Sequence, residues 1–147
     1  MSLERLNTIR EMRKPSCIAV VESGVVLTSV HHAVDAYDLI FPMNFGARVS
    51  ATLGGMLSTN AGGSNVLHYR NKRDLCLGIK VVLPNGEIIK TGGRTKKTSA
   101  GYNLTNLFIG SEGTLGIITE IQLRLSPIPE SMMSAICHFN TLEEAVQ

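Results

Sequence analysis

The sequence predicts an α+β fold, with a mainly antiparallel sheet flanked by helices. Two apolar runs, residues 74–83 and 87–91, flank Pro84-Asn85-Gly86, and an Asn-Gly pair in that position indicates a β-hairpin. Residues 117–125 alternate as a sheet strand does. This alternation places Ile117, Thr119, Ile121, Leu123 and Leu125 on one side, and Ile118, Glu120, Gln122 and Arg124 on the other.

The other segments supply helices, short strands and loops. Residues 3–14 space their apolar side chains as a helix does, although an extended arm is the alternative. Residues 17–21 predict a strand and residues 26–37 an amphipathic helix. Residues 50–63 predict a tight turn into a short helix that ends at Gly62-Gly63, and residues 92–106 a polar loop. Residues 132–139 could begin a further strand, and residues 141–144 a helix.

Composition excludes several classes of protein. The hydrophobic fraction of 44% supports a packed core, and a net charge of +2 argues against a nucleic-acid interface. No apolar run approaches the roughly 18 residues of a transmembrane segment. The N-terminus lacks the apolar stretch of a signal peptide, so a cytoplasmic location is expected. The three cysteines are expected to be buried thiols without a disulfide.

Glycine is concentrated in the middle of the chain, where twelve of the fourteen lie between Gly54 and Gly116. Residues 52–55 and 60–63 combine glycines with small hydroxyls and a carboxamide, so they could cradle an anionic or heterocyclic ligand or form tight structural turns. Residues 111–114 leave the same two alternatives for Glu112. No Walker A box, G-x-G-x-x-G, nucleophile elbow or metal-ligand spacing is found, so no catalytic or metal-binding residue is predicted. His68 is a weaker ligand candidate.

Two ordered sets of motifs resemble a known family of flavoproteins. Phe41-Pro42 with residues 51–55 and 59–63 resembles the FAD-contacting signature of the vanillyl-alcohol-oxidase-like, PCMH-type proteins. Residues 91–94, 97–104 and 107–119 resemble the branch that contains D-lactate dehydrogenases, D-2-hydroxyglutarate dehydrogenases and the glycolate oxidase flavin subunit. The similarity runs from about Ile18 to Pro129, and it is loosest at residues 43–46, where relatives often carry Pro-Asp-Pro-Gly.

The resemblance implies a domain layout and a cofactor. It implies that residues 17–129 form the second, larger FAD-binding subdomain, preceded by an arm (1–16) and followed by the start of a cap domain (130–147), with the chain truncated at both ends. Glu22 and Gly24 match a further cofactor-side turn, and Arg94 is a weaker candidate for the flavin side. The FAD contacts that it implies are Pro42, Ala51, Thr52, Gly54, Gly55, Thr59, Asn60, Gly62, Gly63, Glu112, Gly113, Gly116 and Ile118.

The function implied is that of the FAD-binding portion of an oxidoreductase that passes a hydride from a 2-hydroxy acid to the flavin. The first subdomain and the cap would be supplied in cis or by a partner chain, so the isolated chain is expected to be inactive and to bind FAD poorly. A non-catalytic subunit that completes an FAD site with another polypeptide is the alternative, and a non-flavin nucleotide-binding protein is the third hypothesis. An exposed apolar surface could also support a homo-oligomer.

Overall fold

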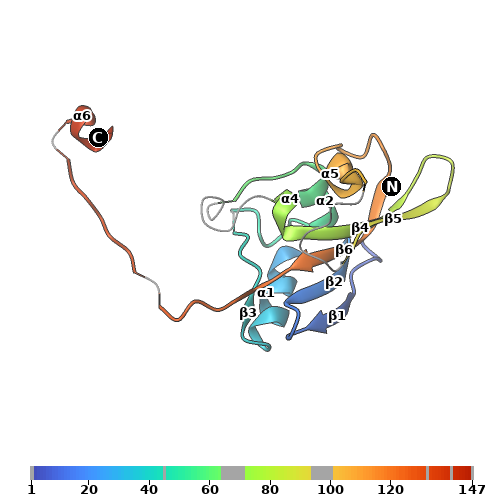
Figure 1. Ribbon diagram of the computed structural model, residues 1–147, viewed down its shortest axis with the longest axis horizontal. Coiled ribbons are helices and arrows are strands. Elements are labelled where there is room, and N and C mark those ends of the chain that lie inside the picture. The colour runs from blue at the N-terminus through green and yellow to red at the C-terminus, as the bar shows by residue number, and fades with distance from the viewer. Residues whose placement is uncertain are drawn as a thin grey trace.

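The computed structural model describes residues 2–44, 46–63, 72–93, 101–131, 133–139 and 141–146. Its centre is a five-stranded antiparallel sheet in the order β1-β2-β6-β4-β5 (Figure 1). A two-stranded sheet pairs β3 with β7. The predicted α+β fold with a mainly antiparallel sheet is therefore confirmed. The strands are β1 (Ile9–Arg13), β2 (Ile18–Glu22), β3 (Leu39–Ile40), β4 (Cys76–Val82), β5 (Ile88–Gly92), β6 (Ile117–Arg124) and β7 (Ser126–Pro127).

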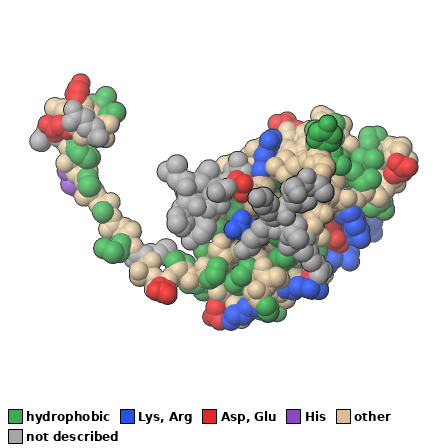
Figure 2. All heavy atoms as spheres, viewed as in Figure 1, with side chains coloured by type: hydrophobic (Ala, Val, Ile, Leu, Met, Phe, Trp, Pro, Cys, Tyr) green, Lys and Arg blue, Asp and Glu red, His purple; other side chains and the backbone are tan. Residues whose placement is uncertain are grey.

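The described helices are α1 (Leu27–Asp35), α2 (Leu53–Ser58), α4 (Lys72–Leu75), α5 (Leu104–Phe108) and α6 (Leu142–Val146). Buried side chains of α1 and α2 join those of the sheet in one hydrophobic core. After β7 the chain runs away from the sheet and ends in α6 (Figure 1). The hydrophobic side chains of this last segment stand in the open (Figure 2), and Met133 is 96% exposed.

The helix predicted at residues 3–14 is wrong, because part of this segment forms the edge strand β1. Ile9 pairs with Val21 and Met12 with Ala19, with a register shift between Ile9 and Glu11. This bulge places Ile9 and Met12, which are three positions apart, on the same side of the strand, facing the core. A bulged strand therefore produced the helix-like spacing.

A similar irregularity changes which side of β6 faces the core. The register runs from Lys80 opposite Glu120 to Val81 opposite Ile118, so Thr119 has no partner of its own on β4. Beyond this bulge Ile118, not Ile117, is buried, with 4% of its surface exposed. The prediction that side chains alternate strictly along residues 117–125 is therefore wrong for Ile117 and Ile118.

Other boundaries also differ from the predictions. α2 ends at Ser58, before the two glycines, because Asn60 adopts the left-handed conformation (φ 47°) that asparagine tolerates. Residues 104–108 are helical, whereas a loop was predicted as far as residue 106, and the Asn103 side chain caps this helix by accepting a hydrogen bond from the amide of Asn106. Residues 133–139 are extended without a strand partner in the described part of the chain, whereas α6 confirms the predicted last helix.

The three cysteines are free thiols with different exposure. Cys76 is buried, and that burial raises the pKa of its thiol to about 12, so it serves as a small apolar side chain. Cys17 is half-buried and Cys137 is exposed, so the prediction of burial holds for Cys76 alone. Across the described ranges, the helices are too short or too polar to cross a membrane.

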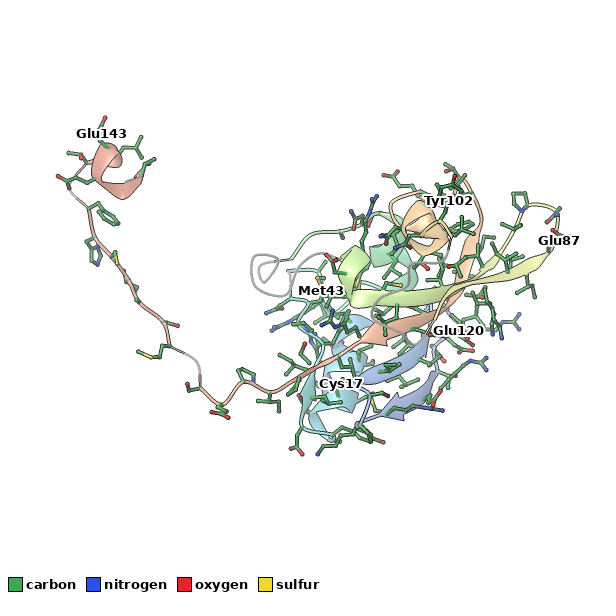
Figure 3. The ribbon with its side chains drawn as sticks, viewed as in Figure 1. Cys17, Met43, Glu87, Tyr102, Glu120 and Glu143 are labelled. Carbon is green, nitrogen blue, oxygen red and sulfur yellow. The ribbon has the colours of Figure 1, made fainter. Side chains whose placement is uncertain are left out.

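A ladder of ion pairs crosses four strands of the sheet. The Glu22 carboxylate on β2 is buried and accepts hydrogen bonds from the Thr8 amide at 2.8 Å and from Arg10 of β1 at 2.5 Å. Arg10 Nε also lies 3.5 Å from Glu120 on β6, which Lys80 of β4 contacts at 2.9 Å (Figure 3). The Thr8 amide, followed by Arg10, lowers the pKa of Glu22. The ionised carboxylate therefore holds β1 to the sheet.

We expect this carboxylate to make stability depend on pH. Because the pKa of Glu22 is lower in the folded chain, its contribution is complete above the unfolded value of about 4.3 and is lost as pH falls through the folded value. Glu22→Gln should lower stability at neutral pH and reduce the loss on acidification. Urea unfolding at several pH values between about 7 and 3 measures this. Glu130→Gln, at an exposed carboxylate, is the control, and an unchanged pH slope in Glu22→Gln would contradict the assignment.

Candidate functional site

A groove with a volume of about 350 Å³ lies along α2 and the segment before it. Its lining contains no ionisable group, and most of the side chains are small, so it suits an uncharged, flat or polyol portion of a ligand. Thr52, Gly55, Met56 and Thr59 share one face of α2 at helical spacing. The groove is lined by Ser50, Ala51, Thr52, Gly55, Met56, Thr59 and Ala61.

Main-chain hydrogen bonds fix the start of α2 beside the segment that follows β2. The amide of Leu53 donates to Val25 at 2.9 Å, and the amide of Gly54 donates to Ser23 at 2.8 Å. The Thr52 side chain accepts from the Gly55 amide, as an N-cap residue does. These three amides therefore already have acceptors inside the chain, so they do not supply the free N–H groups expected of residues 52–55.

The two glycines of α2 have different roles. A Cβ at Gly54 would lie 2.7 Å from Ser23 Cβ, so this position allows the helix to approach the end of β2. Gly55 is exposed and lines the groove. Of this predicted pair, Gly55 faces the candidate ligand space and Gly54 faces the protein.

Unpaired polar groups follow the groove in the sequence. Asn60 Oδ1 is buried and has no hydrogen-bond partner in the described part of the chain. None of the described residues accepts a hydrogen bond from the amides of Gly62 and Gly63. A Cβ at Gly62 would meet nothing within 4 Å, whereas one at Gly63 would lie 2.8 Å from Met43 Sδ. Residues 60–63 therefore offer one acceptor and two donors that the described protein does not use.

A second depression, of about 220 Å³, is lined in part by Met43 (labelled in Figure 3), whose Sδ would lie 2.8 Å from a Cβ built at Gly63. Pro42 is buried here and does not line the groove on α2. Arg48 Nη1 donates to Asn44 Oδ1 at 3.4 Å on its rim. The depression is lined by His31, Val34, Asp35, Ile40, Phe41, Pro42, Met43, Asn44 and Arg48.

The loop after α5 packs against the carboxyl end of α2. The amide of Gly110 donates to Leu57 at 3.0 Å, and that of Glu112 donates to Ser58 at 2.9 Å. Glu112 takes a left-handed conformation (φ 51°) and its side chain is exposed, as is Gly113. These two predicted residues therefore lie beside α2, with the Glu112 carboxylate open to solvent.

The remaining predicted residues are inside the fold. A Cβ at Gly116 would lie 2.7 Å from Val81 Cγ1, and Ile118 belongs to the core. Glu22 is committed to Thr8 and Arg10, and a Cβ at Gly24 would lie 2.7 Å from the Leu6 carbonyl oxygen. The Glu22–Gly24 turn therefore packs against the N-terminal segment.

Three residues of the groove lining were not among the predicted contacts, namely Ser50, Met56 and Ala61. Met56 could have been found from its spacing, since it lies four residues after Thr52 and three before Thr59 on a short helix. His68 and Arg94 lie outside the described residues. Among the described residues, no cluster of His, Cys, Asp and Glu is suited to a metal ion.

Residues 1–92 match the family model for an FAD binding domain. The chain is 44% identical over 148 residues to the probable mitochondrial D-lactate dehydrogenase of Danio rerio, covering 99% of this chain and 29% of the relative. It is 41% identical over 145 residues to the D-2-hydroxyglutarate dehydrogenase of Xanthomonas citri pv. viticola, and the match covers 97% of this chain and 31% of the relative. It is 39% identical over 144 residues to glycolate oxidase subunit GlcD of Bacillus subtilis, and the match covers 98% of this chain and 31% of the relative.

A solved structure of alkyldihydroxyacetonephosphate synthase is similar in fold. The TM-score is 0.75 at 24% sequence identity, and the match covers 87% of this chain and 24% of that one. The similarity therefore extends to the three-dimensional arrangement of most of the chain, while the chain spans under a third of each of the proteins that it matches.

Proposed function

Since the chain belongs to the family of FAD binding domains, we propose that it forms one wall of the FAD site of an oxidoreductase that acts on a 2-hydroxy acid. The groove on α2, continued by the unpaired groups of residues 60–63, is the observation that carries this proposal. D-lactate, glycolate and D-2-hydroxyglutarate are the substrate types that the names of the relatives suggest. We expect the same thirteen residues named from the sequence to include the cofactor contacts.

The residues present fit the flavin portion of FAD. The uncharged lining of the groove suits a flat ring and a ribityl chain, with Thr52 and Thr59 as nearby hydroxyls. Asn60 Oδ1 is an acceptor without a partner, and the Gly62 and Gly63 amides are donors. These groups match the alternating donors and acceptors on the edge of an isoalloxazine ring. We propose that the exposed carboxylate of Glu112 accepts hydrogen bonds from the hydroxyls of the ribose.

FAD, when bound, supplies an acceptor for the hydride that leaves the α-carbon of a 2-hydroxy acid. The lining of the groove contributes no titratable side chain, so it binds and orients without moving a proton. A base for the substrate hydroxyl and a cation for its carboxylate are therefore assigned to parts of the protein outside this groove.

We propose that the rest of the cleft comes from other domains, in the same polypeptide or in a partner chain. Residues 17–129 would be the second FAD subdomain, residues 1–16 an arm before it, and residues 130–147 the start of a cap. The open hydrophobic side chains after β7 support this layout, since Met133, Ile136 and Phe139 are exposed (Figure 2). The same surface could mediate homo-oligomers. Three free thiols support a reducing compartment such as the cytoplasm.

Quenching of flavin fluorescence tests the proposal. Titrated with the 147-residue chain, FAD should show weak but saturable quenching, because only one wall of the cleft is present. NAD and ATP should neither compete nor raise the midpoint of thermal unfolding. A chain that NAD or ATP stabilises and FAD does not would contradict the assignment. If flavin co-purifies with the chain in stoichiometric amount, the expectation that one wall of the cleft binds FAD only weakly is wrong.

A further inference from the structure

Ser23 is a buried polar residue at the junction of β2, β6 and α2. It is 1% exposed, and its Oγ donates a hydrogen bond to the Ile118 carbonyl oxygen at 2.5 Å. Its amide donates to the Thr119 carbonyl oxygen at 3.1 Å, and its own carbonyl accepts from the Gly54 amide at 2.8 Å. One residue therefore bonds to the sheet on one side and to the first turn of α2 on the other.

The contact between Ser23 and α2 is also close. A Cβ on Gly54 would lie 2.7 Å from Ser23 Cβ and 3.1 Å from Ser23 Oγ. Real Cβ atoms do not approach so closely, so both residues must be small for the helix to lie where it does. Gly55, the next residue, lines the groove, and the position of the groove therefore depends on this contact.

The hydroxyl of Ser23 is not needed for that packing, since alanine would be equally small. Its hydrogen bond reaches the bulge at which β6 departs from regular pairing with β4, between Ile118 and Glu120. Irregular strand segments are held by few ladder bonds, so an added side-chain bond restricts them. The amide of Ser23 contacts the second residue of the same bulge.

We propose that Ser23 is a positioning residue, which fixes α2 and its cofactor groove against the bulge of β6. The inference rests on the proposed function for its consequence, FAD binding, but the positioning itself is a property of the free chain. Ser23 does not line the groove and would act through Gly54 and Gly55.

Two measurements on the 147-residue chain test this. Amide hydrogen exchange by NMR should show faster exchange at Gly54 and Gly55 in Ser23→Ala than in wild type. Flavin fluorescence quenching should show FAD affinity reduced by about five- to tenfold, the usual effect of one lost hydrogen bond. Thr91→Val is the matched control, because it removes another buried hydroxyl bond, the one 2.9 Å from Thr105, at the edge strand β5, which β6 and β4 separate from β2. It should change neither quantity, although it lowers global stability.

A double substitution tests the packing of the pair. Gly54→Ala should disturb α2 and lower FAD affinity by more than tenfold, since its new methyl would meet Ser23 Cβ. The double variant Ser23→Gly with Gly54→Ala lacks Ser23 Cβ, the atom that the new methyl would meet. Compared with Gly54→Ala alone, it should recover part of the order of α2 and part of the affinity for FAD. If the effects of the two substitutions on FAD affinity simply add in the double variant, the inference is overturned.

The positioning role of Ser23 and the binding of FAD can be rejected independently. Exchange at Gly54 that rises no more in Ser23→Ala than in Thr91→Val would overturn the positioning role, whatever the affinity for FAD. A wild-type chain that does not quench FAD at all, with exchange at Gly54 still dependent on Ser23, would reject the proposed function and leave the positioning role supported.

Discussion

Gly62→Val should weaken FAD binding by tenfold or more, about 1.4 kcal/mol, while the free energy of unfolding stays within about 0.5 kcal/mol of wild type. A Cβ at Gly62 would meet no atom of the described residues within 4 Å, so this part of the fold has room for the larger side chain. The Gly62 and Gly63 amides have no acceptor among the described residues, and a valine beside them would obstruct a ligand that uses them. Flavin fluorescence quenching and urea unfolding measure the two quantities.

Gly93→Val is the control for this substitution. A Cβ at Gly93 would also meet no atom of the described residues within 4 Å, but this residue follows the edge strand β5 and does not line the groove. The same change of side chain there should leave FAD affinity unaltered. Equal losses of affinity in the two variants, or a Gly62→Val chain that binds FAD as wild type does, would place the cofactor elsewhere.

The candidate site could be predicted from the sequence in outline but not residue by residue. The short helix expected within the glycine-rich segment 50–63 is α2, and a groove lies along it. Sequence alone could not distinguish Gly54 from Gly55, since the difference is that one faces Ser23 and the other faces solvent. Glycine is required both where a chain approaches itself and where a ligand approaches the chain, and only tertiary packing separates the two.

The fold was predictable wherever a segment obeyed one period. The β4–β5 hairpin and strand β6 follow from alternation and from Asn85-Gly86, whose glycine takes φ 89°. The errors arose at bulges, where one extra residue reverses the alternation, as between Ile9 and Glu11. Helix α5 was missed because five residues are too few to show a period, and its cap depends on a single side chain, Asn103.

Gly92→Ala should be among the most destabilising single substitutions in this chain, costing about 4 kcal/mol or more. Its φ of 71° lies in the left-handed region, which costs other residues about 1–2 kcal/mol. The new Cβ would also lie 2.7 Å from Gly78 Cα and 2.8 Å from Thr105 Oγ1, and it would collide with the Leu77 carbonyl oxygen. Backbone atoms of a paired strand cannot move aside as the end of a flexible side chain can, so overpacking adds to the cost of the dihedral.

Gly86→Ala separates the two contributions to that cost. Gly86 has a φ of 89° in the hairpin turn, but a Cβ there would meet nothing within 4 Å, so only the dihedral cost of about 1–2 kcal/mol should appear. The difference between the two variants in urea unfolding therefore measures the close approach of β5 to β4 and α5. Equal destabilisation by Gly86→Ala and Gly92→Ala would show that β5 gives way at no cost. A large difference would instead show that the backbone of β4 beside Gly92 cannot move aside for an added Cβ.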